Sequence, residues 1–116
     1  MGIRAYVVKQ GNEHDGCEYF CNRMVDVMYM LDDNEIPFKH CTEKSSRKYD
    51  ASWVIDCANG ELQQYIAKLE TMPPNELHEN FQECHNPYSN EEVLAILRAW
   101  LRYIDPKENV IRVHWN

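Results

Sequence analysis

Hydrophobic and polar residues along the chain follow two different periods, and each period predicts one kind of element. Near the C-terminus, Ile111 and Val113 alternate with Arg112 and His114, which predicts a strand with one buried face. Three other segments are short, contain β-branched or aromatic residues, and end near turn-forming residues. The sequence therefore predicts four strands, at Ile3–Val8, Ile36–Thr42, Tyr49–Cys57 and Val110–Trp115.

Apolar residues three and four positions apart predict helices between these strands. One such pattern predicts a short helix at Leu62–Leu69, which must end before Pro73-Pro74 because proline cannot continue a helix. A longer helix is predicted to open after Asp15-Gly16 and to end at Asp32-Asp33. Its apolar face consists of Cys17, Phe20, Cys21, Met24, Met28 and Leu31.

Two further helices are predicted in the last third of the chain. The segment Asn75–Cys84 carries apolar residues four and three positions apart, which predicts a third short helix. Ser89 and Glu92 form a capping box, in which each side chain accepts a hydrogen bond from the other residue's backbone N–H. The box predicts the start of a fourth helix, which runs to Ile104.

The predicted order of elements is β-α-β-β-α-α-α-β, and the length of 116 residues predicts one domain, 1–116. This order is typical of an α+β fold with a four-stranded, mostly antiparallel sheet packed against three to four helices. The strands at Ile36–Thr42 and Tyr49–Cys57 are expected to pair as an antiparallel hairpin around the basic loop Glu43–Lys48.

The charge balance is strongly acidic, with 19 Asp and Glu against 12 Lys and Arg and a net charge of -7. Such a surface repels phosphate, so we expect no nucleic-acid partner. The acids are concentrated in two tracts, 12–38 and 69–97, and the second tract contains no Lys or Arg. Whether the tracts form one electrostatic field or two depends on the fold. Such a field attracts a basic partner, and salt weakens it.

The three Trp and seven Tyr exceed what one small core requires, and these residue types are enriched at protein interfaces. Tyr19 and Tyr29 lie off the apolar face of the first predicted helix, among acids. The sequence therefore predicts a small acidic protein that binds and inhibits a basic protein, for example a bacterial immunity protein that neutralises a nuclease toxin. The predicted contact residues are Asp15, Glu18, Tyr19, Asp26, Asp32 and Asp33, with Glu76, Glu79 and Glu83 as an alternative patch.

Histidine and cysteine residues suggest two other functions. His14, Cys17 and Cys21 project from one face if the first helix begins early, which is compatible with a zinc-binding module. A small cytosolic enzyme with a Cys/His site is the second alternative, with Cys17 beside His14 or Cys57 as its nucleophile. The ordinary interpretation is that Cys17 and Cys21 belong to an apolar core face. No Gly-rich phosphate loop and no paired zinc knuckle occur, so neither an enzyme nor a cofactor is the favoured prediction.

The N-terminus and the cysteines bear on location. The polar stretch that begins at Lys9 leaves no signal-peptide core, and no run approaches 18 apolar residues. An odd number of five cysteines is typical of reduced thiols in a cytosol. We therefore expect a cytoplasmic protein that does not bind a membrane.

Overall fold

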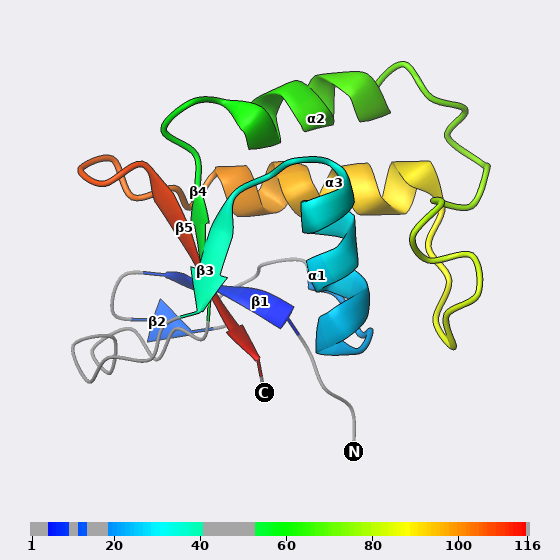
Figure 1. Cartoon of the computed structure of the whole chain (residues 1–116), viewed down its shortest axis with the longest axis horizontal. Helices are drawn as coiled ribbons and strands as arrows, with labels where there is room; N and C mark the ends of the chain where they lie inside the picture. Colours follow the sequence, from blue (N-terminus) through cyan, green and yellow to red (C-terminus); the bar gives the residue numbers. More distant parts are fainter. Residues whose placement is uncertain (1–4, 10–11, 14–18, 41–52, 116) are drawn as a thin grey trace.

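The protein has an α+β fold (Figure 1). The computed structural model describes the backbone of residues 5–9, 12–13, 19–40 and 53–115, and the side chains of residues 19–40 and 53–113. Within these ranges, three helices accompany one antiparallel sheet, which confirms the predicted class. The basic loop Glu43–Lys48 lies outside the described residues.

The sheet has five strands in the described residues, one more than predicted, in the order β2-β1-β5-β4-β3. The additional strand is β2, whose two residues are too few to show a hydrophobic period. Every neighbouring pair is antiparallel, and Phe38 lies opposite Ile55, so β3 and β4 pair as expected. The strands are β1 (Ala5–Lys9), β2 (Asn12–Glu13), β3 (Phe38–His40), β4 (Trp53–Asp56) and β5 (Val110–Trp115).

The described helices are α1 (Met24–Asp33), α2 (Glu61–Leu69) and α3 (Asn90–Leu101). The capping box at the start of α3 is confirmed. Ser89 Oγ accepts from the Glu92 N–H at 3.1 Å, and Glu92 Oε1 accepts from the Ser89 N–H at 2.9 Å. None of the three described helices is long and apolar enough to cross a membrane.

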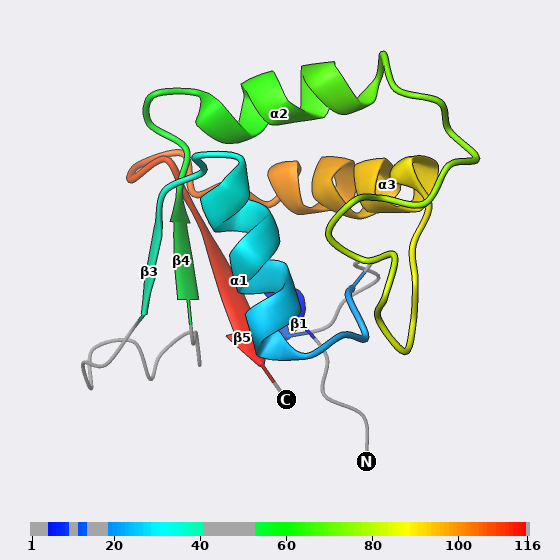
Figure 2. The ribbon, with the colours of Figure 1, turned by 45° about the vertical axis from the view of Figure 1, so that its right-hand side comes forward.

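One buried core joins the sheet to the helices. Trp53 and Ile55 of β4 lie opposite Val113 and Ile111 of β5, and all four side chains are fully buried. Residues of α1, α2 and α3 belong to the same core cluster, and Figures 1 and 2 show α2 alongside α3. The sheet is therefore covered on one face by helices.

The first helix begins at Met24, so the predicted start near Asp15 is wrong for the described part of that segment. Tertiary hydrogen bonds explain the difference. The Cys21 N–H donates to the Tyr88 hydroxyl at 2.9 Å, and Asn86 Nδ2 donates to the Cys21 carbonyl at 2.9 Å. These bonds tie the backbone of Cys21 to a distant loop instead of to a helix. The neighbouring side chain of Phe20 is nevertheless fully buried, as its apolar position predicts.

The predicted helix at Asn75–Cys84 is also wrong, because this stretch consists of turns. Its internal backbone bonds close single turns, such as that from the Phe81 N–H to the His78 carbonyl, and other backbone groups bond to Tyr88 and to Asn90, the first residue of α3. The His78 N–H donates to the Tyr88 carbonyl at 2.8 Å, and the Asn90 N–H donates to the Glu76 carbonyl at 2.8 Å. We refer to residues 70–89, which connect α2 to α3, as the 70–89 segment.

Aromatic residues contribute more to the core than the sequence analysis assumed. Phe20 stacks on Phe81 and meets Trp100 edge-on, with ring centroids 5.4 Å apart in both cases. Trp53 and Trp100 are fully buried, and Tyr19 and Tyr29 are exposed. The surplus of aromatic residues is therefore accounted for in part by packing between the 70–89 segment, α3 and the residues before α1.

Candidate interaction surface

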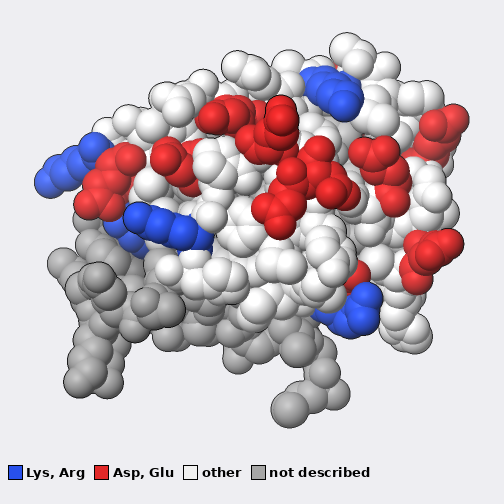
Figure 3. Space-filling view, in the orientation of Figure 1, with Lys and Arg blue, Asp and Glu red and all other residues white. Residues whose placement is uncertain are grey.

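Acidic side chains gather on one side of the molecule, over the end of α1, over α2 and over the 70–89 segment (Figure 3). Asn80 Nδ2 donates a hydrogen bond of 2.8 Å to Asp33 Oδ2, so the two acidic tracts meet there. Glu79 is close enough to Tyr65 of α2 for its charge to raise the pKa of the tyrosine. The two tracts therefore adjoin in space.

A hollow of about 440 Å³ lies between the end of α1 and α2. Asp33, the last residue of α1, and Glu35, two residues beyond it, line one side, and Glu61 and Lys68 of α2 line the other. Lys68 is the one base among these described lining residues. We define the acidic face as Asp33, Glu35, Glu61 and Glu79. Neither Glu35 nor Glu61 was among the predicted contact residues, although Glu35 belongs to the first acidic tract; Glu61 lies between the two tracts.

The end of α1 places Glu35 on this face through a Schellman motif. The Glu35 N–H donates to the Asp32 carbonyl at 3.1 Å, and the Ile36 N–H donates to the Leu31 carbonyl at 2.9 Å. This motif requires a left-handed residue, and Glu35 has φ +57°. Glycine is the usual residue at such a position, because a Cβ atom makes the left-handed conformation unfavourable.

The charges at the end of α1 oppose the helix dipole. Asp32 and Asp33 occupy the last turn, which contains no base. The C-terminal end of a helix carries partial negative charge, so an acid there is unfavourable by a few tenths of a kcal/mol to about 1 kcal/mol. The dipole and the carboxylates together make this surface strongly attractive to a cation.

The other predicted contact residues are distributed over several parts of the molecule. Asp26 is buried and pairs with Arg23 at 3.0 Å, so it does not belong to the acidic face. Tyr19 is exposed before α1. Three acids are exposed in the last turn of α1 and in the 70–89 segment, namely Asp32, Glu76 and Glu83. Asp15 and Glu18 lie outside the described residues.

A buried hydrogen bond lies behind the acidic face. His78 is 1% exposed and Tyr65 is 6% exposed, and His78 Nε2 is bonded to the Tyr65 hydroxyl. Burial lowers the pKa of His78 to about 4 and is the main cause that raises the pKa of Tyr65. The sequence does not single out His78, because neither its spacing nor its neighbours distinguish it from an exposed histidine.

The arrangement of the thiols does not support the helical zinc-site geometry. Cys21 precedes α1 on a non-helical stretch, so it does not lie on the predicted helix face. The other two predicted ligands, His14 and Cys17, lie outside the described residues. Burial raises the pKa of Cys57 to about 11 and also raises the pKa of Cys84, which disfavours the reactive thiolate. In the described ranges, no three His, Cys, Asp or Glu side chains gather as metal ligands.

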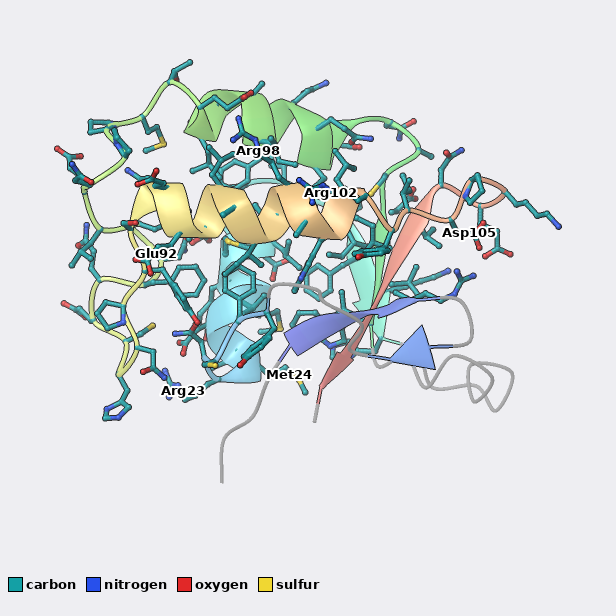
Figure 4. The ribbon with its side chains drawn as sticks, turned by 180° about the vertical axis from the view of Figure 1, so that it is seen from behind. Arg23, Met24, Glu92, Arg98, Arg102 and Asp105 are labelled. Carbon is teal, nitrogen blue, oxygen red and sulfur yellow. The ribbon has the colours of Figure 1, made fainter. Side chains whose placement is uncertain are left out.

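The ion pairs that arginine side chains of α3 and β5 form lie away from the hollow. Figure 4, the view from behind, shows Arg98 on α3 and Arg102 directly after its last residue. Arg98 pairs with Glu70, and Arg112 of β5 pairs with Asp105 and Glu108. These ion pairs lie outside the hollow, whose described lining residues include three acids.

Comparison of the chain with protein-family models, with curated proteins and with solved structures finds no match.

Proposed function

We propose that the protein binds a basic protein partner through its acidic face and thereby inhibits it, as an immunity protein inhibits a nuclease toxin. The observation that carries this proposal is Glu35. It takes a left-handed position that favours glycine, and it adds a carboxylate to a helix end that already carries Asp32 and Asp33. Both features oppose stability, so a role in binding explains them better than a role in folding.

The shape of the surface supports the same proposal. The hollow is lined by Asp33, Glu35 and Glu61, and a lysine or arginine of a partner fits its size and charge. Exposed Tyr29 stands one helical turn before Asp33 on α1 and provides apolar area beside the acids. An acidic field of this kind acts mainly on the association rate, and salt screens it.

The experiment begins with tagged protein exposed to lysate of its source cells and washed at rising salt. We expect one stoichiometric basic protein, whose retention weakens as salt increases. The association rate is then measured with Glu61→Lys and with Lys68→Glu, which change the charge of the same hollow in opposite directions. We expect the first to slow association about tenfold and the second to leave it equal or faster.

A matched control separates the acidic face from net charge. Glu35→Gln and Glu108→Gln remove the same charge, but Glu108 pairs with Arg112 outside the hollow. Only Glu35→Gln is expected to slow association. Equal effects of the two variants, or no basic partner at any salt, contradict the proposed function.

A further inference from the structure

The Tyr65–His78 hydrogen bond anchors the 70–89 segment to α2. Both side chains are more than nine-tenths buried, and the ring of His78 also lies 5.3 Å from that of Phe81 between centroids. The other ring nitrogen, Nδ1, accepts the Asn80 N–H at 3.1 Å. Every polar atom of the imidazole is therefore used.

These bonds define one protonation state. Because Nδ1 accepts from a backbone N–H, it carries no proton, and Nε2 must carry the proton that it donates to the Tyr65 hydroxyl. A second proton on Nδ1 would face the Asn80 N–H, so two donors would meet in a buried site. The turn at 78–81 cannot accept that proton without moving away from α2.

Charged groups near this pair come from each neighbouring element. Among the described residues none of them hydrogen-bonds to the imidazole, so none forms a direct ion pair with a positive charge there. Asp33 of α1 is linked to the turn by its hydrogen bond from Asn80, and Glu61 and Lys68 of α2 line the same hollow as Tyr65. Glu79 of the 70–89 segment acts on Tyr65, and Glu92 of α3 acts on Tyr88.

We propose that His78 is an acid-sensitive latch, whose protonation releases the turn at 78–81 from α1 and α2 while the sheet and α3 remain folded. The same turn carries Glu79 and donates the Asn80 hydrogen bond to Asp33. Opening of the latch therefore removes one side of the acidic face. Acid should therefore also weaken partner binding. This consequence rests on the proposed function, whereas the latch itself does not.

The expected size of the effect follows from linkage. The pKa of His78 is about 4 in the folded protein against an ordinary value of 6.5, so the open form binds the proton more tightly. The ratio of open to closed forms should therefore rise as pH falls, by about tenfold between pH 7.5 and 5.5 and by about 150-fold between pH 7.5 and 4.

Amide hydrogen exchange of the protein alone tests the latch. The amide of Asn80 reports the turn, because its hydrogen bond to His78 Nδ1 breaks when the imidazole is protonated and the turn opens. After correction for the intrinsic exchange rate, we expect its opening constant to rise about tenfold from pH 7.5 to 5.5. At each pH it should exceed the opening constant of α3, which reports global unfolding.

Two variants identify the residue responsible. His78→Gln should abolish the rise in opening constant, and His85→Gln, on the same segment and exposed, should retain it. If His78→Gln does not fold, the ¹⁵N shifts of the wild-type imidazole decide: we expect His78 to remain neutral at pH 5.5 with its proton on Nε2. A turn that opens only together with α3, or opening that does not depend on pH, overturns the latch, and neither outcome involves the partner.

Discussion

Asn80 donates a hydrogen bond to Asp33, which lies 47 positions earlier in the sequence, and this contact joins the two acidic tracts. It links the last turn of α1 to the turns of the 70–89 segment. Through the same turn, the buried imidazole of His78 is connected to the acidic face. The position of the acidic residues and the packing of the segment are therefore coupled.

The strained position of Glu35 predicts a gain in stability when it is replaced by glycine. Glu35→Gly should raise the free energy of unfolding by about 1 kcal/mol, because glycine adopts φ +57° without steric cost. Glu35→Ala removes the same charge but keeps a Cβ atom, so it should not give this gain. Urea denaturation of the three proteins measures the difference, and equal stability of Gly and Ala variants would show that Glu35 is not strained.

The same pair of variants separates stability from binding. Both lose the carboxylate that lines the hollow, so both should associate more slowly with a basic partner. A glycine variant that is more stable but binds less well would show that Glu35 is retained for function at the expense of stability.

The capping box predicts a measurable contribution of Ser89 to α3. Ser89→Ala removes the acceptor of the Glu92 N–H and should lower the free energy of unfolding by about 1 kcal/mol. Ser89→Thr keeps a hydroxyl in the same place and should cost less. Denaturant titration compares the three proteins; an alanine variant as stable as the wild type would contradict a contribution from the cap.

The neighbouring residues Tyr19 and Phe20 should differ sharply in their contribution to stability. Phe20 is fully buried against Phe81 and Trp100, so Phe20→Ala should cost about 3–5 kcal/mol. Tyr19 is 40% exposed, and Tyr19→Ala should cost less than about 1 kcal/mol. Thermal or urea unfolding measures both, and similar losses would place the two side chains in similar surroundings, contrary to the structure.

The buried thiol of Cys57 should be protected from alkylation. Because its pKa is about 11 in the folded protein and ordinarily 9, its thiolate fraction at pH 8 should be about 100-fold lower than in the unfolded chain. Iodoacetamide labelling with and without denaturant, read by peptide mass spectrometry, measures this ratio. Exposed Cys21 serves as the reference for reagent access. Rapid labelling of Cys57 in the native protein would exclude its burial.

The raised pKa of Cys57 also has a consequence for stability. Above pH 9 the unfolded chain loses this proton more readily than the folded protein does, so stability should fall as pH rises from 9 towards 11. Cys57→Ala should reduce that fall, which urea titrations of both proteins at pH 8 and 10 can measure. The same fall in both would assign it to other groups.

Elements whose signals are local could be predicted from the order of residues alone. The capping box of Ser89 and Glu92 involves residues three positions apart, and the alternation in β5 involves immediate neighbours, so both could be predicted without the fold. The antiparallel pairing of β3 and β4 was also predicted, because the two strands are close in sequence. The basic partner that the acidic composition predicted stays a prediction, and the composition does not show which acids lie together.

The tertiary structure decided the features that depend on distant residues. Cys21 fits a helical period, but Tyr88 and Asn86 bind its backbone, so α1 begins only at Met24. Residues 75–84 also fit a helical period, but backbone groups of Glu76 and His78 bond to Asn90 and Tyr88 at the start of α3 and just before it. Periodicity measures which positions are apolar, whereas a hydrogen bond between remote segments depends on the path of the whole chain. For the same reason, only the fold shows that Asp33 meets Asn80 and that His78 is buried behind them.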